Sequence, residues 1–155
     1  MKFREVSETK QQMWNYIRYF NNVKEAFDQF ITNFNSYLSS QNDFPVKSSN
    51  NLKDGVRIEV FLDTVDICMD FVERNMAIWG KLVVSVYIAP EKHEELFILY
   101  FDDDGKIYDS LEDVRPQSSF GNRYFSEVLL LMIYNSVLSR HSYVKGLKCE
   151  DGRDA

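Results

Sequence analysis

Residues 7–40 read SETKQQMWNYIRYFNNVKEAFDQFITNFNSYLSS and predict the element around which the fold is built. Apolar side chains recur there every seven residues, and a second apolar position follows each of them three residues later. Such a repeat marks one face of an α-helix. Aromatic residues dominate both positions, which favours packing on a sheet over a coiled coil with Leu and Ile knobs. The two series are Met13, Phe20, Phe27 and Phe34, and Tyr16, Val23, Phe30 and Tyr37.

The length of this helix sets a second constraint. At 1.5 Å per residue, a continuous helix over 7–40 extends ~50 Å, whereas a compact domain of this size has a radius of gyration near ~15 Å. Asn21-Asn22 is the weakest point for helix propensity. Either the helix breaks there into two, or it protrudes and contacts a partner; both alternatives stay open.

Strand patterns follow a polar segment, 41–55, that is expected to be a mobile linker. Residues 64–75 fit both a strand and one face of a helix, and the alternation weakly favours a strand. Asp103-Asp104-Gly105 predicts a hairpin turn. The final apolar stretch, 122–140, predicts a helix buried on most sides. The remaining strands are expected at 56–62, 81–89, 95–102 and 106–109.

These elements predict an α+β fold with a long, possibly broken N-terminal helix, a mainly antiparallel sheet of four or five strands, and a buried C-terminal helix. A chain of 155 residues fits one domain. We expect that domain to span 1–144 and the polar tail, 145–155, to be disordered.

Negative charge is concentrated in the middle of the chain. Residues 56–121 carry 14 Asp/Glu against 6 Lys/Arg, a net of −8, whereas 1–55 and 122–155 each come to +1. An acidic sheet region predicts a surface for a basic partner. A pI near 4.9 argues against direct binding of nucleic acid, which needs a basic stripe. The candidate acidic surface comprises Asp102, Asp103, Asp104, Glu112, Asp113, Glu94 and Glu95.

The Asp102-Asp103-Asp104-Gly105 run is a poor match to a calcium loop. With Gly105 at the sixth position, the first and twelfth ligands would be Tyr100 and Leu111, neither of which can serve. A hairpin turn with an exposed anionic tip is the better interpretation.

Catalytic motifs are sparse. Glu59, Asp63, Asp66 and Asp70 are the best candidates for paired carboxylates, but their spacing fits a solvated strand face. His93 and His141 have no second His or Cys at metal-ligand spacing. Cys68 and Cys149 fit two unpaired, reduced thiols. No phosphate-binding glycine motif occurs, so we expect no cofactor and no metal.

The order helix, strands, helix, with small size and acidity, resembles secretion chaperones of the type III kind. Several small acidic inhibitors and toxin-immunity proteins share that general character. The likeness is one of fold and carries no motif. We therefore expect a non-catalytic protein that binds a basic protein partner as an inhibitor, immunity factor or chaperone. The alternative is a small enzyme whose site assembles around Glu59, Asp63 and Asp66.

Apolar surface also predicts possible self-association as a homodimer. The strands at 81–89 and 95–102 are apolar on both faces, and only two helices are available to cover them. The residues expected at a self-contact are Met13, Phe20, Phe27, Phe34 and Phe97. The N-terminus lacks the apolar core of a signal peptide and no run is long enough to span a bilayer. A cytoplasmic protein without membrane contact is expected.

Overall fold

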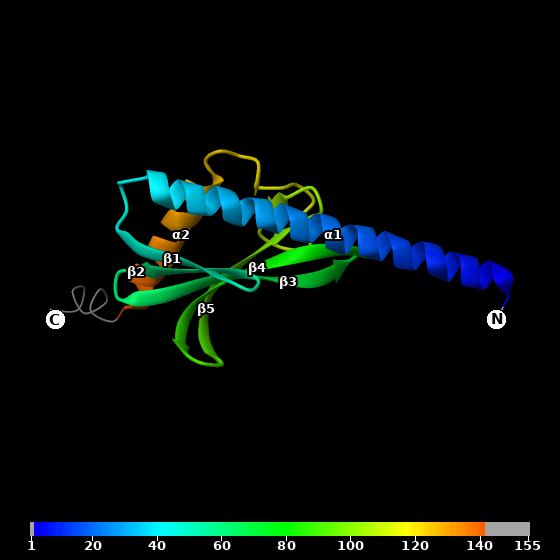
Figure 1. The fold of residues 1–155 in the computed structure, drawn as a ribbon, viewed down its shortest axis with the longest axis horizontal. Helices are drawn as coiled ribbons and strands as arrows, with labels where there is room; N and C mark the ends of the chain where they lie inside the picture. The colour runs from blue at the N-terminus through cyan, green and yellow to red at the C-terminus, as the bar shows by residue number, and fades with distance from the viewer. Residues whose placement is uncertain (1, 142–155) are drawn as a thin grey trace.

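One long helix lies along a curled antiparallel sheet in the computed structural model, which describes residues 2–141 (Figure 1). Helix α1 spans Phe3–Ser40 and helix α2 spans Phe125–Arg140. Between them lie seven strands: β1 (Val46–Leu52), β2 (Gly55–Val60), β3 (Asp63–Arg74), β4 (Ala77–Ala89), β5 (Lys92–Phe101), β6 (Lys106–Tyr108) and β7 (Ser118–Ser119). The α+β class is confirmed, with seven strands in place of the expected four or five.

The strands form a meander in which each one pairs antiparallel with the next, in the order β1 to β7. The doubtful segment 64–75 belongs to β3, so the strand interpretation is confirmed. The segment 41–55 contains β1, although the sequence predicts a linker there. Pairing of β1 with β2 supplies its backbone partners, and the Asn51 side chain accepts a hydrogen bond from the Asn35 amide of α1 at 3.0 Å. The predicted tail at 145–155 lies outside the described residues, as does Cys149.

The core fills one face of the sheet, and both helices pack on that face. Alternate residues of the central strands point into it, for example Ile67 of β3 and Leu82 of β4. Phe27 of α1 stacks on Phe101 of β5 with ring centroids 6.3 Å apart. Gly80 leaves room for the Phe101 ring, because a Cβ there would lie 2.0 Å from its Cζ. We call the opposite face of the sheet, which no helix of the described residues covers, the open face.

Helix α1 is continuous through Asn21-Asn22 and protrudes past the sheet. Its 38 residues make it ~57 Å long, and Figure 1 shows it continuing beyond the ends of β3 and β4. Buried Val23 and the edge-on contact of Phe20 with Phe71 of β3 hold the helix on both sides of the asparagines. This packing outweighs the low helix propensity of Asn, which is on the order of 0.7 kcal/mol per residue.

Candidate functional site

The predicted acidic surface is divided between distant parts of the molecule. Asp102 follows the last residue of β5, whereas Glu94 and Glu95 lie near its first residue. Eight residues of extended strand separate Glu94 from Asp102, which is roughly 25 Å. These carboxylates cannot form one patch.

Asp102 organises the β5–β6 turn. Its Oδ1 accepts hydrogen bonds from the backbone N–H groups of Asp104 and Lys106 at 3.0 and 2.9 Å. Its Oδ2 accepts one from the Tyr108 hydroxyl at 3.1 Å. Gly105 has a φ of +78°, which an L side chain rarely adopts. The predicted hairpin turn is confirmed, and the carboxylate of Asp102 is committed to it.

Asp103 and Asp104 face helix α1 across a hollow of about 350 Å³. Burial, followed by the charges of Asp104 and Asp102, raises the pKa of Asp103 above its ordinary value. Helix α1 contributes Glu25 and three uncharged residues to the same hollow. We call it the acidic hollow; its lining is Asn22, Glu25, Ala26, Gln29, Asp103 and Asp104, with no basic residue.

Glu112 and Asp113, two further members of the predicted surface, make hydrogen bonds within one loop. The Ser110 hydroxyl donates to the Glu112 carboxylate, and this hydrogen bond lowers the pKa of Glu112. Asp113 accepts a hydrogen bond from the Ser110 backbone N–H at 3.2 Å, and its own carbonyl accepts one from Arg74 at 3.1 Å. These contacts close the loop that follows β6.

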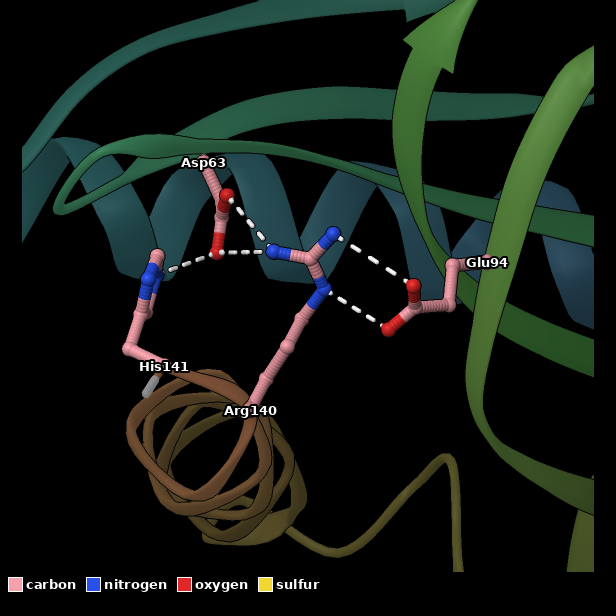
Figure 2. Close-up of polar contacts among 4 residues, drawn as sticks. All are labelled: Asp63, Glu94, Arg140 and His141. Carbon is pink, nitrogen blue, oxygen red and sulfur yellow. Dashed lines mark hydrogen bonds and ion pairs between the residues drawn. The ribbon is translucent and has the colours of Figure 1, made fainter. Parts of the chain in front are cut away.

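Glu94 belongs to an ion-pair cluster at the C-terminal end of α2 (Figure 2). Arg140 donates through Nε to Glu94 at 2.8 Å and through Nη1 to Asp63 at 3.3 Å. His141 Nε2 lies 2.8 Å from the second oxygen of Asp63. Because Asp63 begins β3 and Glu94 belongs to β5, the cluster fastens α2 to two strands of the sheet.

A second cluster surrounds Asp66 on the open face. Asp66 is 2% exposed, and its carboxylate receives two hydrogen bonds from the guanidinium of Arg57, at 2.7 and 2.9 Å. His93 Nε2 lies 3.0 Å from the same carboxylate. Burial alone would raise the pKa of Asp66, but the hydrogen bonds from Arg57 and His93 outweigh it and lower that pKa. The Tyr87 ring covers Arg57 with 4.0 Å between the guanidinium and the ring centroid.

A hollow of about 370 Å³ lies beside the Asp66 cluster. Cys68, Ser85, His93 and Glu95 are among its lining residues. Burial, then the charge of Asp66, raises the pKa of Cys68 to about 11. The thiol is therefore protonated near neutral pH and is a weak nucleophile.

The three carboxylates of the predicted enzyme site do not converge. Asp63 shares the helix-covered face with Val65, whereas Asp66 lies on the open face and Glu59 is exposed on β2. The prediction of a solvated strand face is wrong for Asp63 and Asp66, whose side chains are 10% and 3% exposed. Strand alternation separates Asp63 from Asp66, and the structure gives each its own arginine and histidine.

The residues predicted for self-association divide along α1. Phe27 and Phe34 are buried in the core and are not available for a self-contact, whereas Phe97 is partly buried and packs against the core. Met13 and Phe20 are 51% and 38% exposed. Further exposed apolar residues lie on the same half of α1 and were not among the residues predicted for self-association, although helical spacing places them near the apolar stripe: Phe3, Val6, Trp14 and Ile17.

No helix among residues 2–141 is long and apolar enough to cross a membrane. Comparisons of the chain with family models, with curated proteins and with solved structures give no match.

Proposed function

We propose that this chain is a non-catalytic protein-binding protein, and that a basic segment of its partner docks in the acidic hollow. The observation that carries the proposal is the hollow itself, where Glu25, Asp103 and Asp104 meet with no basic side chain in the lining. Three carboxylates in one concavity attract a lysine- or arginine-rich segment.

Because several carboxylates of the predicted acidic surface are already paired, fewer residues are candidates for contact with the partner. Asp102, Glu112, Asp113 and Glu94 make internal hydrogen bonds or ion pairs. Within the β5–β6 turn, Asp103 and Asp104 line the hollow, where Asp103 also has a side-chain hydrogen bond with Asn22 of α1. The inhibitor, immunity-factor and chaperone roles all require this kind of surface, and the partner's identity would separate them.

The proposal is tested by binding of an arginine-rich peptide, followed by fluorescence anisotropy at low and high salt. We expect the double variant Asp103→Asn/Asp104→Asn to weaken binding several-fold and to reduce its salt dependence, since exposed charges are screened within ~8 Å at physiological ionic strength. Glu59→Gln is the matched control, because Glu59 is an exposed acid on another element. Asp102 is left intact so that the turn keeps its hydrogen bonds. Equal loss in the control, or no loss in the double variant, would contradict the proposal.

A small enzyme remains the second candidate, and its site would be the hollow beside Asp66. His93 lies between the buried carboxylate and the cavity, as an oriented general base would. Against this role, the carboxylate of Asp66 is already paired with Arg57 and the thiol of Cys68 is protonated. A His93→Gln variant separates the two functions, because it should leave peptide binding at the acidic hollow unchanged.

A further inference from the structure

The hollow beside Asp66 contains a polar group that the fold leaves without a partner. Ser85 of β4 is 7% exposed, so its hydroxyl is largely shielded from solvent. No hydrogen bond of this hydroxyl occurs among residues 2–141, although buried polar groups are almost always hydrogen-bonded. Leaving such a group unpaired is destabilising, so the hydroxyl marks a position where a ligand can supply the partner that the chain does not.

Strand alternation explains why Ser85 faces this hollow. Its neighbours on β4, Val84 and Val86, are buried on the helix-covered side, so Ser85 points to the open face. There it lies opposite Asp66 of β3 and opposite Glu95 of β5 in the two strand pairings. We call this cavity of about 370 Å³ the open-face hollow; its lining is Cys68, Met69, Asp70, Val83, Ser85, His93 and Glu95.

The polar groups of the open-face hollow accept hydrogen bonds. Asp70 and Glu95 are exposed, and their ionised carboxylates are acceptors only. His93 Nε2 lies 3.0 Å from the carboxylate of Asp66 and donates to it, because an ionised carboxylate has no hydrogen to give. In the neutral ring this leaves Nδ1 of His93 as an acceptor. The complement of these groups is a ligand that donates hydrogen bonds.

The charge of the lining favours a cation. Asp70 and Glu95 contribute two negative charges, and none of the described residues that line the hollow is Lys or Arg. Lys81 lies opposite Asp70 on β4, but it is not part of the lining, and no ion pair joins the two side chains within residues 2–141. Cys68 and Val83 add apolar surface, and the protonated thiol of Cys68 adds no charge.

A metal ion is a poorer match than an organic cation. Among residues 2–141, only the Asp102–Asp104 group brings three possible ligand atoms within 4.8 Å of one another. Asp70, His93 and Glu95 are therefore too far apart to bind one ion together. A larger cation with an apolar portion can reach the carboxylates and also cover the apolar lining.

We infer that the open-face hollow binds a small primary amine in its ammonium form, through Ser85, Asp70 and Glu95. An ammonium group has three N–H donors and no acceptor, which matches one hydroxyl and two carboxylates. A short alkyl chain then lies against Cys68 and Val83. A volume of about 370 Å³ is at the small end of ligand sites, which favours a compact molecule over a peptide. The acidic hollow is built from other residues, so this inference is independent of the proposed function.

Titration of the full chain with butylamine, followed by amide chemical shifts in nuclear magnetic resonance, tests the site. We expect saturable shifts at Cys68, Val83 and Ser85. The uncharged analogue 1-butanol has the same alkyl chain and should bind at least about tenfold more weakly, because it lacks the charge-assisted hydrogen bonds. Equal binding of the alcohol would overturn the inference. So would shifts confined to Asp103 and Asp104, which would place the amine in the acidic hollow.

Two variants test the groups that contact the ammonium. Ser85→Ala should weaken butylamine binding about tenfold, yet should not lower the melting temperature of the ligand-free chain, because it removes an unpaired buried hydroxyl. Glu95→Gln should weaken binding several-fold by removing one of the two charges. Glu59→Gln is the matched control, since Glu59 is an exposed acid of β2 outside the hollow. Unchanged affinity in Ser85→Ala or Glu95→Gln, or an equal loss in the control, would overturn the inference.

The double variant Asp103→Asn/Asp104→Asn separates this site from the proposed function. It should lose peptide binding at the acidic hollow and keep the affinity of the wild-type chain for butylamine. Loss of butylamine binding in this variant would overturn the inference, whereas retained peptide binding would contradict only the proposed function.

Discussion

The two halves of α1 have the same apolar repeat and opposite environments. Val23–Phe34 contains four buried residues, three of them phenylalanines, whereas large apolar side chains of the free half, Phe3–Phe20, remain exposed. A heptad repeat therefore establishes which face of a helix is apolar, but the length of the sheet decides how much of that face becomes core. The excess of helix over sheet is the feature that distinguishes this molecule from a compact domain.

Removing one aromatic ring from each half of α1 should give the largest difference in the free energy of unfolding. Phe30 packs against the rings of Phe27, Phe34, Phe120 and Phe125. Phe30→Ala should lower the free energy of unfolding by about 3–5 kcal/mol, because it removes transfer energy and leaves a cavity. Trp14→Ala, in the free half, should change it by no more than about 0.5 kcal/mol. Urea denaturation measures both changes in the free energy of unfolding, and comparable losses would contradict the division of α1.

The second-largest effect is expected from weakening the sheet that supports the buried half of α1. Arg57→Ala leaves the carboxylate of Asp66 buried without its bidentate partner, which should cost about 3 kcal/mol. The double variant Arg57→Ala/Asp66→Asn should recover much of the loss, because it removes the uncompensated charge. If the single and double variants are equally destabilised, the cost comes from lost packing of Arg57 on Tyr87 instead.

Low pH should weaken the same ion pair, between Arg57 and Asp66. The pKa of Asp66 is lower in the folded state than in the unfolded chain, where it is about 3.9. The pair therefore stabilises the fold at pH values above about 4, and this contribution is lost as pH falls through the lower, folded pKa. The acid limb of a stability–pH curve should flatten in Asp66→Asn. If Asp66→Asn keeps the acid limb of the wild-type stability–pH curve, the loss of stability in acid comes from other carboxylates.

Sequence reasoning recovered most of the fold because its signals are local repeats and apolar runs. The heptad repeat located α1, the apolar stretch at 122–140 located α2, alternation located β2, and apolar runs located β4 and β5. The turn at Phe61 gave no signal: its φ of 55° is unusual for a bulky residue, and its ring contacts that of Tyr134 with 5.0 Å between centroids. Strand β1 was missed because its polar composition resembles a linker and its order depends on pairing with β2.

The candidate site was harder to predict, since charge along a sequence does not show which carboxylates are already paired. Asp66 is an example: nothing local indicates that Arg57 and His93 enclose it. Asp103 and Glu25 are the opposite case, because they meet across elements far apart in the chain. In both cases, contacts between residues far apart in the sequence determine the surroundings of the carboxylate.

The smallest expected effect on stability comes from a substitution at the junction between the two halves of α1. Asn21→Ala replaces an exposed residue of low helix propensity in the middle of α1. If the helix is continuous there, the variant should gain about 0.5 kcal/mol of stability by thermal or urea unfolding. No gain would indicate that the helix breaks at this point in solution.

Hydrogen exchange along α1 tests the central contrast most directly. Peptides covering Val23–Phe34 should exchange slowly at every protein concentration, because their side chains lie in the core. Peptides covering Phe3–Phe20 should exchange much faster, because the large apolar side chains of this half remain exposed. Protection of Phe3–Phe20 equal to that of Val23–Phe34 would contradict the account.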